Sequence, residues 1–226
     1  MPNIKPAAVA GQFYPKNIKE LQAKVDKLLG GAQKSGLQPK AIITPHAGMR
    51  YSGEIAASAD AGLEDRANEI QRVIMLGPTH RVGVPGIAIP SQDSFATPLG
   101  NVALDQDLLH SMYKFKKVWV ADKAFEQEHC LEVQLPFLQK QLGDFQLVPL
   151  LVGQATPEEV GSILSYLWGG HETLIVISSD LSHYLPYEKA YQTDLATHDS
   201  IIAMHEDQIK HGQACGIFSV CGMLYI

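Results

Sequence analysis

The chain has 226 residues, of which 46% are hydrophobic, 19% charged and 8% aromatic, and its formal net charge is -6. This composition is typical of a globular protein and excludes a disordered or fibrous chain. The acidic balance argues against a nucleic-acid-binding surface, which needs clustered Lys and Arg. Single α/β domains commonly reach roughly 200 to 250 residues, so we expect one domain over residues 1–226.

Targeting signals and cysteines bear on the location of the protein. The first six residues contain no apolar core of roughly seven to fifteen residues, so we expect no secretory signal there. No apolar run approaches the ~18 residues that span a bilayer. Three cysteines without export features indicate reduced thiols. We therefore expect a cytoplasmic protein that contacts neither nucleic acid nor membrane.

Taken along the chain, the first predicted element is a helix. Leu21, Val25 and Leu28 share one of its faces, and Gly30 and Gly31 are typical of its end. Four short apolar runs then predict buried strands, at 40–44, 72–76, 145–152 and 174–178. Stretches with helical periodicity separate them, so we predict a three-layer α/β fold with a mainly parallel central sheet flanked by helices.

The connecting segments carry local signals of their own. An Ala-rich helix is predicted at 53–63, and Pro136 within the helical pattern of 131–142 predicts either a kink or a helix that begins near it. Thr156 and Pro157 are typical of a helix start and open a helix at 158–167. A further helix is predicted around 200–205. The Gly- and Pro-rich stretch 83–100 predicts a loop with short antiparallel strands above the sheet.

Two histidines follow predicted strands in similar turns. His46 comes after Pro45, and His80 follows Pro78 and Thr79. Alone, each imidazole could equally hydrogen-bond a loop carbonyl. Open α/β sheets bind ligands beyond the carboxyl ends of their strands, and we expect these two strands to be neighbours. The pair therefore predicts a metal site at this rim of the sheet.

A third strand end adds Asp180 and His183. The carboxylate could orient a ligand histidine or accept a proton, and the imidazole could act as a general acid or base. The alternative is that Ser179 or Asp180 caps a helix.

A fourth cluster contains Glu128, His129 and Glu132, ahead of an apolar helix. The carboxylates could do no more than stabilise the helix dipole. We single out His129 as the functional candidate in this cluster.

The cysteines and the remaining histidines give weaker signals. Cys215 could reach the same rim, although a lone cysteine is more often a small buried apolar side chain, as we expect for Cys130 and Cys221. The histidines without convergent neighbours are expected at the surface: His110, His171, His198, His205 and His211.

An ordered set of motifs resembles the Memo family across nearly the whole chain. The matching segments are AVAGQFYP at 8–15, PHAG at 45–48, YSG at 51–53, LGPTH at 76–80, EH at 128–129, EVQLPFL at 132–138, SSDLSH at 178–183 and CG at 215–216. The order of these segments makes the resemblance far more specific than any one of them.

The resemblance implies a fold similar to the class III extradiol ring-cleaving dioxygenases, which hold a non-haem iron with two histidines and a carboxylate. Memo-like proteins present two histidines and a cysteine, here His46, His80 and Cys215. By the same comparison, Asp180, His183 and His129 would be catalytic residues lining the pocket.

Three functions follow as hypotheses. The first is a metal-dependent oxidoreductase related to the dioxygenases, with iron as the implied ion and copper or zinc also suited to the donor set. The second is a non-catalytic metal- or peptide-binding module that acts through protein contacts. The third, a zinc hydrolase, lacks a clearly placed carboxylate base. A small molecule or a peptide is the expected ligand, and family members imply a radical-SAM protein as a partner.

Two departures from the family pattern stand out. Met49 and Arg50 lie between the PHAG turn and Tyr51, where an aromatic residue commonly follows the glycine. Family members also continue beyond the position of Ile226 with a helix and further strands, so we expect this sequence to be a shortened form.

Overall fold

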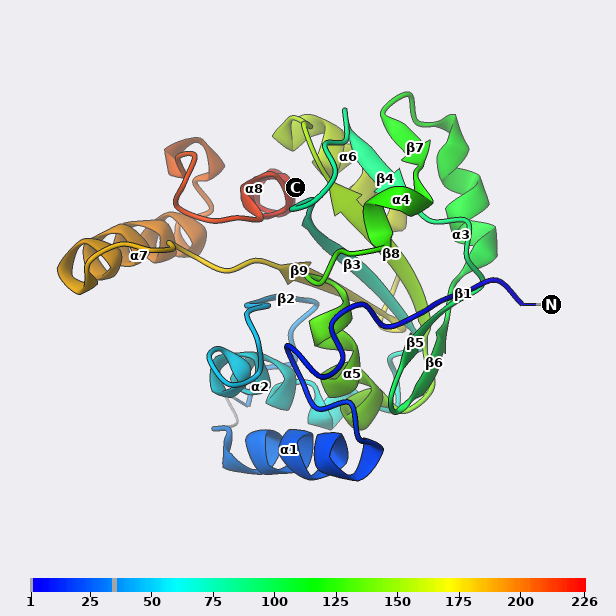
Figure 1. Ribbon diagram of the computed structural model, residues 1–226. Helices are drawn as coiled ribbons and strands as arrows, with labels where there is room; N and C mark the ends of the chain where they lie inside the picture. Colours follow the sequence, from blue (N-terminus) through cyan, green and yellow to red (C-terminus); the bar gives the residue numbers. More distant parts are fainter. Residues whose placement is uncertain (1, 34–35) are drawn as a thin grey trace.

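Each of the four apolar runs forms a strand of one six-stranded sheet in the computed structural model, which describes residues 2–33 and 36–226. In spatial order the strands are β2 (Ala41–Thr44), β9 (Thr173–Ser178), β3 (Arg72–Pro78), β8 (Gln146–Val152), β4 (Ile87–Ile89) and β7 (Val118–Val120). All neighbours are parallel except β8 and β4. The mainly parallel sheet is confirmed (Figure 1).

The expectation that the two histidine-bearing strands are neighbours is wrong. β9 lies between β2 and β3 and pairs with both of them. Every residue of β9 is buried, whereas β2 alternates between buried and half-buried residues, as an edge strand does. The two histidine turns therefore lie two strand spacings apart, roughly 10 Å, and only their side chains can bring them together.

The segment 83–100 also differs in part from its prediction. β5 (Ser94–Thr97) and β6 (Gly100–Ala103) form the expected antiparallel pair, in a second sheet with β1 (Ile4–Lys5). β4, however, joins the main sheet instead of lying above it. Its three residues are fully buried and apolar, so the core is the place that removes them from water.

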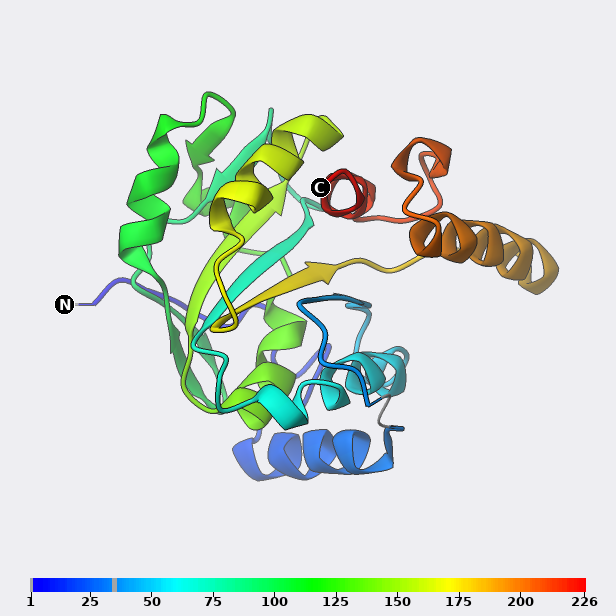
Figure 2. The same ribbon diagram turned by 180° about the vertical axis from the view of Figure 1, so that it is seen from behind.

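Helices cover both faces of the main sheet. α1 (Ile18–Gly31), α2 (Gly53–Ala61) and α5 (Leu135–Leu142) pack together on one face. α6 (Pro157–Leu167) and α8 (Ile217–Leu224) pack on the other (Figures 1 and 2). The remaining helices are α3 (Gln106–Ser111), α4 (Asp122–Phe125), α7 (Tyr187–Ile202) and the short 3₁₀ helices η1 (Glu64–Arg66), η2 (Met112–Lys114), η3 (Glu132–Gln134) and η4 (Glu206–Gln208). The three-layer architecture is confirmed.

The helix signals read from the sequence have clear structural counterparts. The Thr156 hydroxyl accepts from the Glu159 backbone N–H, and the Glu159 carboxylate accepts from the Thr156 N–H, so α6 begins with a reciprocal cap. Pro136 lies in the first turn of α5, where its missing N–H costs nothing, so it marks a helix start and not a kink.

The last part of the chain departs most from expectation. α7 runs from Tyr187 to Ile202, whereas a helix was predicted only around 200–205, and Met204 beyond its end has a left-handed φ of 56°. α7 extends away from the sheet beyond the end of β9 (Figures 1 and 2). Among the described residues, no helix combines the length and apolarity that crossing a bilayer requires.

Candidate metal centre

His46 follows β2 and is held at both its backbone and its ring. Its backbone N–H donates to Asp180 Oδ1 at 2.7 Å, which ties the turn after β2 to the end of β9. Its Nδ1 lies 2.8 Å from the hydroxyl of Ser178, the last residue of β9. The side chain is 1% exposed. The neighbouring strand β9 therefore orients this histidine.

The hydrogen bonds of Ser178 decide which nitrogen of His46 is free. The single hydroxyl proton of Ser178 is donated to the Cys130 carbonyl at 2.7 Å, while Gln134 Nε2 donates to the same oxygen at 3.0 Å. The hydroxyl must then accept from His46 Nδ1–H. This leaves Nε2 as the nitrogen that faces Cys215 Sγ, 3.3 Å away, and loss of any proton from it frees the lone pair that a ligand nitrogen needs.

His80 is oriented in a similar way by a carboxylate. Glu128 is buried. Its Oε2 accepts from the His80 backbone N–H at 2.6 Å, and its Oε1 lies 2.9 Å from His80 Nδ1. The backbone N–H groups of His129 and Cys130 also donate to Glu128, at 2.8 and 3.1 Å. Burial opposes the charge, but the hydrogen bonds from His129 and His80 hold the pKa of Glu128 well below its ordinary value. An ionised Glu128 accepts Nδ1–H and leaves His80 Nε2 for a ligand.

Cys215 completes the cluster through the end of β9. Its backbone N–H donates to the Asp180 carbonyl at 3.1 Å, and the Asp180 N–H lies 3.2 Å from Sγ. Gly216 packs so closely that a Cβ on it would lie 2.7 Å from Ser179 Cβ. Burial works against the thiolate, but hydrogen bonds to His46 and His80 lower the pKa of Cys215 to about 6.

His80 is the charge partner of this thiolate. Burial disfavours the imidazolium, but hydrogen bonds to Cys215 and Glu128 raise the pKa of His80 to about 9. In the metal-free protein the two groups thus form an imidazolium–thiolate pair. A metal ion favours the same ionised sulfur and displaces the imidazolium proton.

The residues present fit a metal ion. One ligand atom each from His46, His80 and Cys215 lies within 4.8 Å of the others. The 3.3 Å between His46 Nε2 and Cys215 Sγ is close to the roughly 3.5 Å that separates nitrogen and sulfur ligands in a tetrahedral zinc site. The structure therefore brings together the three residues that the family resemblance implies as ligands.

A second group, formed by His80, Glu128 and His129, is equally close. The Glu128 oxygens already accept three backbone N–H groups and face the Nδ1 atoms of both histidines, with His129 Nδ1 at 3.1 Å. We therefore assign Glu128 to the support of the imidazoles. The sequence places this carboxylate beside His129, but its contact with His80 was not predicted.

The three residues expected to be catalytic, His129, Asp180 and His183, differ in how deeply their side chains are buried. The His129 ring stacks on His80 with 4.7 Å between centroids and lies 5.5 Å from the His46 ring. Asp180 holds the His46 backbone, and its Oδ2 lies 3.5 Å from Nε2 of the more exposed His183. The helix-cap alternative for Asp180 does not apply, because α7 begins only at Tyr187.

The structure also places the remaining carboxylate, cysteines and histidines that the sequence singled out. Glu132 is buried and accepts from the Tyr14 hydroxyl and the backbone of the N-terminal segment, so it serves packing and not a helix dipole. Cys130 and Cys221 are free and buried. The five histidines expected at the surface are exposed.

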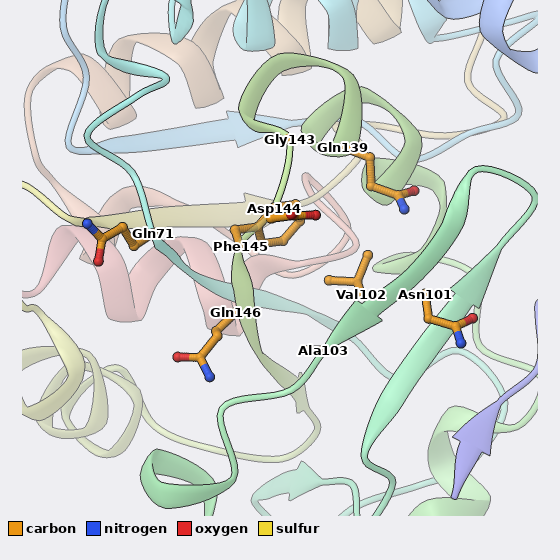
Figure 3. Close-up of a pocket in the computed structure, with 9 residues that line it drawn as sticks. All are labelled: Gln71, Asn101, Val102, Ala103, Gln139, Gly143, Asp144, Phe145 and Gln146. Carbon is orange, nitrogen blue, oxygen red and sulfur yellow. The ribbon is translucent and has the colours of Figure 1, made fainter. Parts of the chain in front are cut away.

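Two cavities of about 410 Å³ lie at opposite ends of the sheet. One borders Cys215, between the ends of β3 and β8 and the start of α8. The other lies at the amino ends of β3 and β8, where Gln71 and Gln146 lie on one side of Phe145 and Asn101 and Gln139 on the other (Figure 3). Only the first adjoins the candidate ligands.

Comparison with known proteins gives consistent matches. The family model described as Memo-like protein matches residues 5–226. A MEMO1 family protein of Aquifex aeolicus is 34% identical, over 98% of this chain and 83% of that protein. A MEMO1 family protein of Thermoplasma volcanium is 32% identical, over 99% of this chain and 86% of that protein.

A solved structure is also similar in part. The crystal structure of an uncharacterized protein from Escherichia coli K12 aligns with a TM-score of 0.45 and 14% identity, over 74% of this chain and 80% of that one. That likeness is too weak to support an argument. The sequence matches cover nearly the whole chain, and they establish that it belongs to the Memo family.

Proposed function

We propose that the protein holds one transition-metal ion between His46 Nε2, His80 Nε2 and Cys215 Sγ and acts as a metal-dependent oxidoreductase. The observation that carries this proposal is the convergence of the three ligand atoms within 4.8 Å, while the second nitrogen of each imidazole is engaged elsewhere. Imidazoles oriented in this way are typical of metal ligands.

Iron is the ion that we propose first, because the family resemblance implies a fold like that of non-haem iron dioxygenases. Two imidazoles and a thiolate also suit copper and zinc. Three protein ligands leave coordination positions open, and a bound ion would supply there an electrophilic, redox-active site for oxygen or substrate.

The surrounding residues have separate proposed roles. Glu128 fixes the ring of His80 and places a negative charge beside it, and Ser178 does the equivalent for His46 without a charge. His129 keeps Nδ1 on Glu128, which frees its Nε2 to carry a proton near the open positions. Asp180 and His183 form a second proton-carrying pair closer to solvent.

The alternative is a non-catalytic metal- or peptide-binding module. It is favoured by one face of α7, where Tyr187, Tyr191, Leu195 and Ile202 follow helical spacing and are all exposed. Contiguous exposed apolar side chains are typical of protein-interaction surfaces. A thiol ligand for the ion also makes the reducing cytoplasm the compartment that we propose.

Anaerobic purification followed by metal analysis and oxygen-uptake measurements tests the proposal. We expect about one ion per chain, oxygen uptake with a panel of phenols, and loss of uptake in His46→Ala and His80→Ala. Iron-loaded protein that never consumes oxygen would reject the oxidoreductase function and leave the binding module. Replacement of Tyr187 and Tyr191 by Ser is the matched control, since it should leave oxygen uptake unchanged.

A further inference from the structure

The cavity beside Cys215 is an open pocket lined by elements from three parts of the chain. Thr79 comes from the end of β3, Val84 from the loop after His80, and Gln154 from the end of β8. Cys215 and Phe218 line it on the side of α8. The cavity thus shares one residue with the proposed ligand set and lies on its sulfur side.

The walls of this cavity are fixed by the backbone. Gly153 N–H donates to the Gly86 carbonyl at 2.8 Å, and Gln154 N–H donates to the Val84 carbonyl at 2.9 Å. A Cβ at position 153 would lie 2.1 Å from the Val84 oxygen, so only glycine allows this approach. The cavity is therefore preformed, as most small-molecule sites are.

The residues that line the cavity determine what charge and polarity a ligand can have. Among the described residues that line the cavity, none is Asp, Glu, Lys, Arg or His, and Pro78, Val84, Val152 and Phe218 supply apolar surface. The Thr79 hydroxyl and the Gln154 amide make no hydrogen bond within the part of the chain that the structure describes. Such a lining suits an uncharged, largely apolar molecule with one hydrogen-bonding group.

We propose that this cavity is the substrate site of the metal centre and that it takes a small, uncharged, largely apolar molecule. Thr79 and Gln154 would bind its polar group, and Val152 and Phe218 would contact its apolar body. The inference rests on the proposed metal-dependent function, because Cys215 connects the cavity to the ion. Its volume of about 410 Å³ lies within the range of small-molecule sites, roughly 300 to 1,000 Å³.

Benzamide is a suitable probe, with the cationic benzamidine as its charged counterpart. Titration of the metal-free, isotope-labelled full chain should shift the NMR signals of Thr79, Val152 and Phe218. Benzamidine should bind at least about tenfold more weakly, because the one anion of the lining, the Cys215 thiolate, is already paired with the His80 imidazolium and no other lining residue offers a counter-charge. Shifts confined to the opposite cavity, or equal affinity for the two probes, would overturn the inference.

Two variants test the contacts separately. Thr79→Val removes the hydroxyl at nearly constant volume and should weaken benzamide binding about fivefold, the loss expected for one neutral hydrogen bond. Gly83→Leu adds a side chain at the cavity wall; a Cβ there meets nothing within 4 Å, so the fold should tolerate it and benzamide binding should be lost. Gln146→Leu, in the opposite cavity, is the matched control and should not change the affinity. Unchanged affinity in both cavity variants would reject the proposed site.

Zinc titration of the same samples separates this inference from the proposed function. Zinc binding without benzamide binding would reject the substrate site and leave the metal centre intact. Benzamide binding without zinc binding would reject the metal centre, and with it the role of the cavity as its substrate site. Support requires zinc binding in the native chain, in Thr79→Val and in Gly83→Leu, with benzamide binding weakened only in the two variants.

Discussion

The two ends of the main sheet carry cavities of equal volume and different chemistry. At the carboxyl end, two imidazoles and a thiol converge, and a buried carboxylate supports them. At the amino end, amide side chains surround Phe145, and one of them, Gln139, already bonds to Thr97 and Gly100. Cavity size therefore does not identify the functional site. The convergent ligand atoms of His46, His80 and Cys215 are what distinguishes the carboxyl end from the amino end.

Removal of a ligand should have the largest effect. His80→Ala should lower zinc affinity by more than about 100-fold. Loss of a residue that only hydrogen-bonds a metal ligand already lowers metal affinity about 10- to 100-fold. Gln71→Ala changes the other end of the sheet and should leave affinity unchanged. Competition with a chromophoric chelator measures both, and equal affinities for the two variants would refute the difference between the ends.

Loss of the supporting carboxylate should have the next largest effect. Glu128→Gln keeps the side-chain shape but removes the charge beside His80, so zinc affinity should fall about 10- to 100-fold. Glu132→Gln is the matched control: this buried carboxylate accepts from Lys5, Tyr14 and the backbone of the N-terminal segment. It should lower thermal stability while affinity changes by less than about tenfold. The same chelator assay would contradict this role of Glu128 if the control lost more affinity.

The buried carboxyl groups of Asp60 and Glu128 have pKa values shifted in opposite directions, so they respond differently to pH. Asp60 on α2 is fully buried, its Oδ2 has no hydrogen-bond partner among residues 2–33 and 36–226, and burial raises its pKa well above the ordinary value. A carboxyl group with a raised folded-state pKa lowers the free energy of unfolding as pH rises above the unfolded-state value, about pH 4. Asp60→Asn should therefore be about 1–3 kcal/mol more stable than the native chain at neutral pH, with the difference vanishing near pH 4.

Urea unfolding at several pH values measures this difference. A difference that stayed constant with pH would mean that the titration of Asp60 does not contribute to it.

The smallest effect is expected at the amide-rich cavity. Gln139→Leu removes the hydrogen bonds with Thr97 Oγ1 at 2.6 Å and with the Gly100 carbonyl at 3.2 Å. The free energy of unfolding should fall by about 1 kcal/mol, with zinc affinity unchanged. Calorimetry of the unfolding transition and the chelator assay test these two outcomes, and a loss of zinc affinity would show that the two ends are coupled.

Local signals in the sequence predict most of the fold. The apolar runs at 40–44 and 174–178 form strands, and the predicted cap at Thr156 begins a helix, because these features depend on neighbouring residues alone. Pro136 left a kink and a helix start open, and the structure shows a helix start. The spatial order of the strands does not depend on neighbouring residues alone, so local signals do not predict it. That β9 separates β2 from β3 follows from which strand is buried on both faces, a property of the assembled sheet.

The candidate site likewise has a part that the sequence predicts and a part that it does not. His46, His80 and Cys215 were named from strand ends and from the family resemblance, and the structure brings them together. Their support was not foreseen. Glu128 next to His129 carries the same sequence signal whether it caps a helix or orients His80, 48 residues earlier in the chain, and only tertiary contacts distinguish these roles.

X-ray absorption spectroscopy of the zinc-loaded protein tests the central claim most directly, because it counts the atoms bound to the ion. We expect one sulfur at about 2.3 Å and imidazole nitrogens at about 2.0–2.1 Å, with the sulfur lost in Cys215→Ser. An ion bound with no sulfur, or with sulfur that persists in Cys215→Ser, would contradict it.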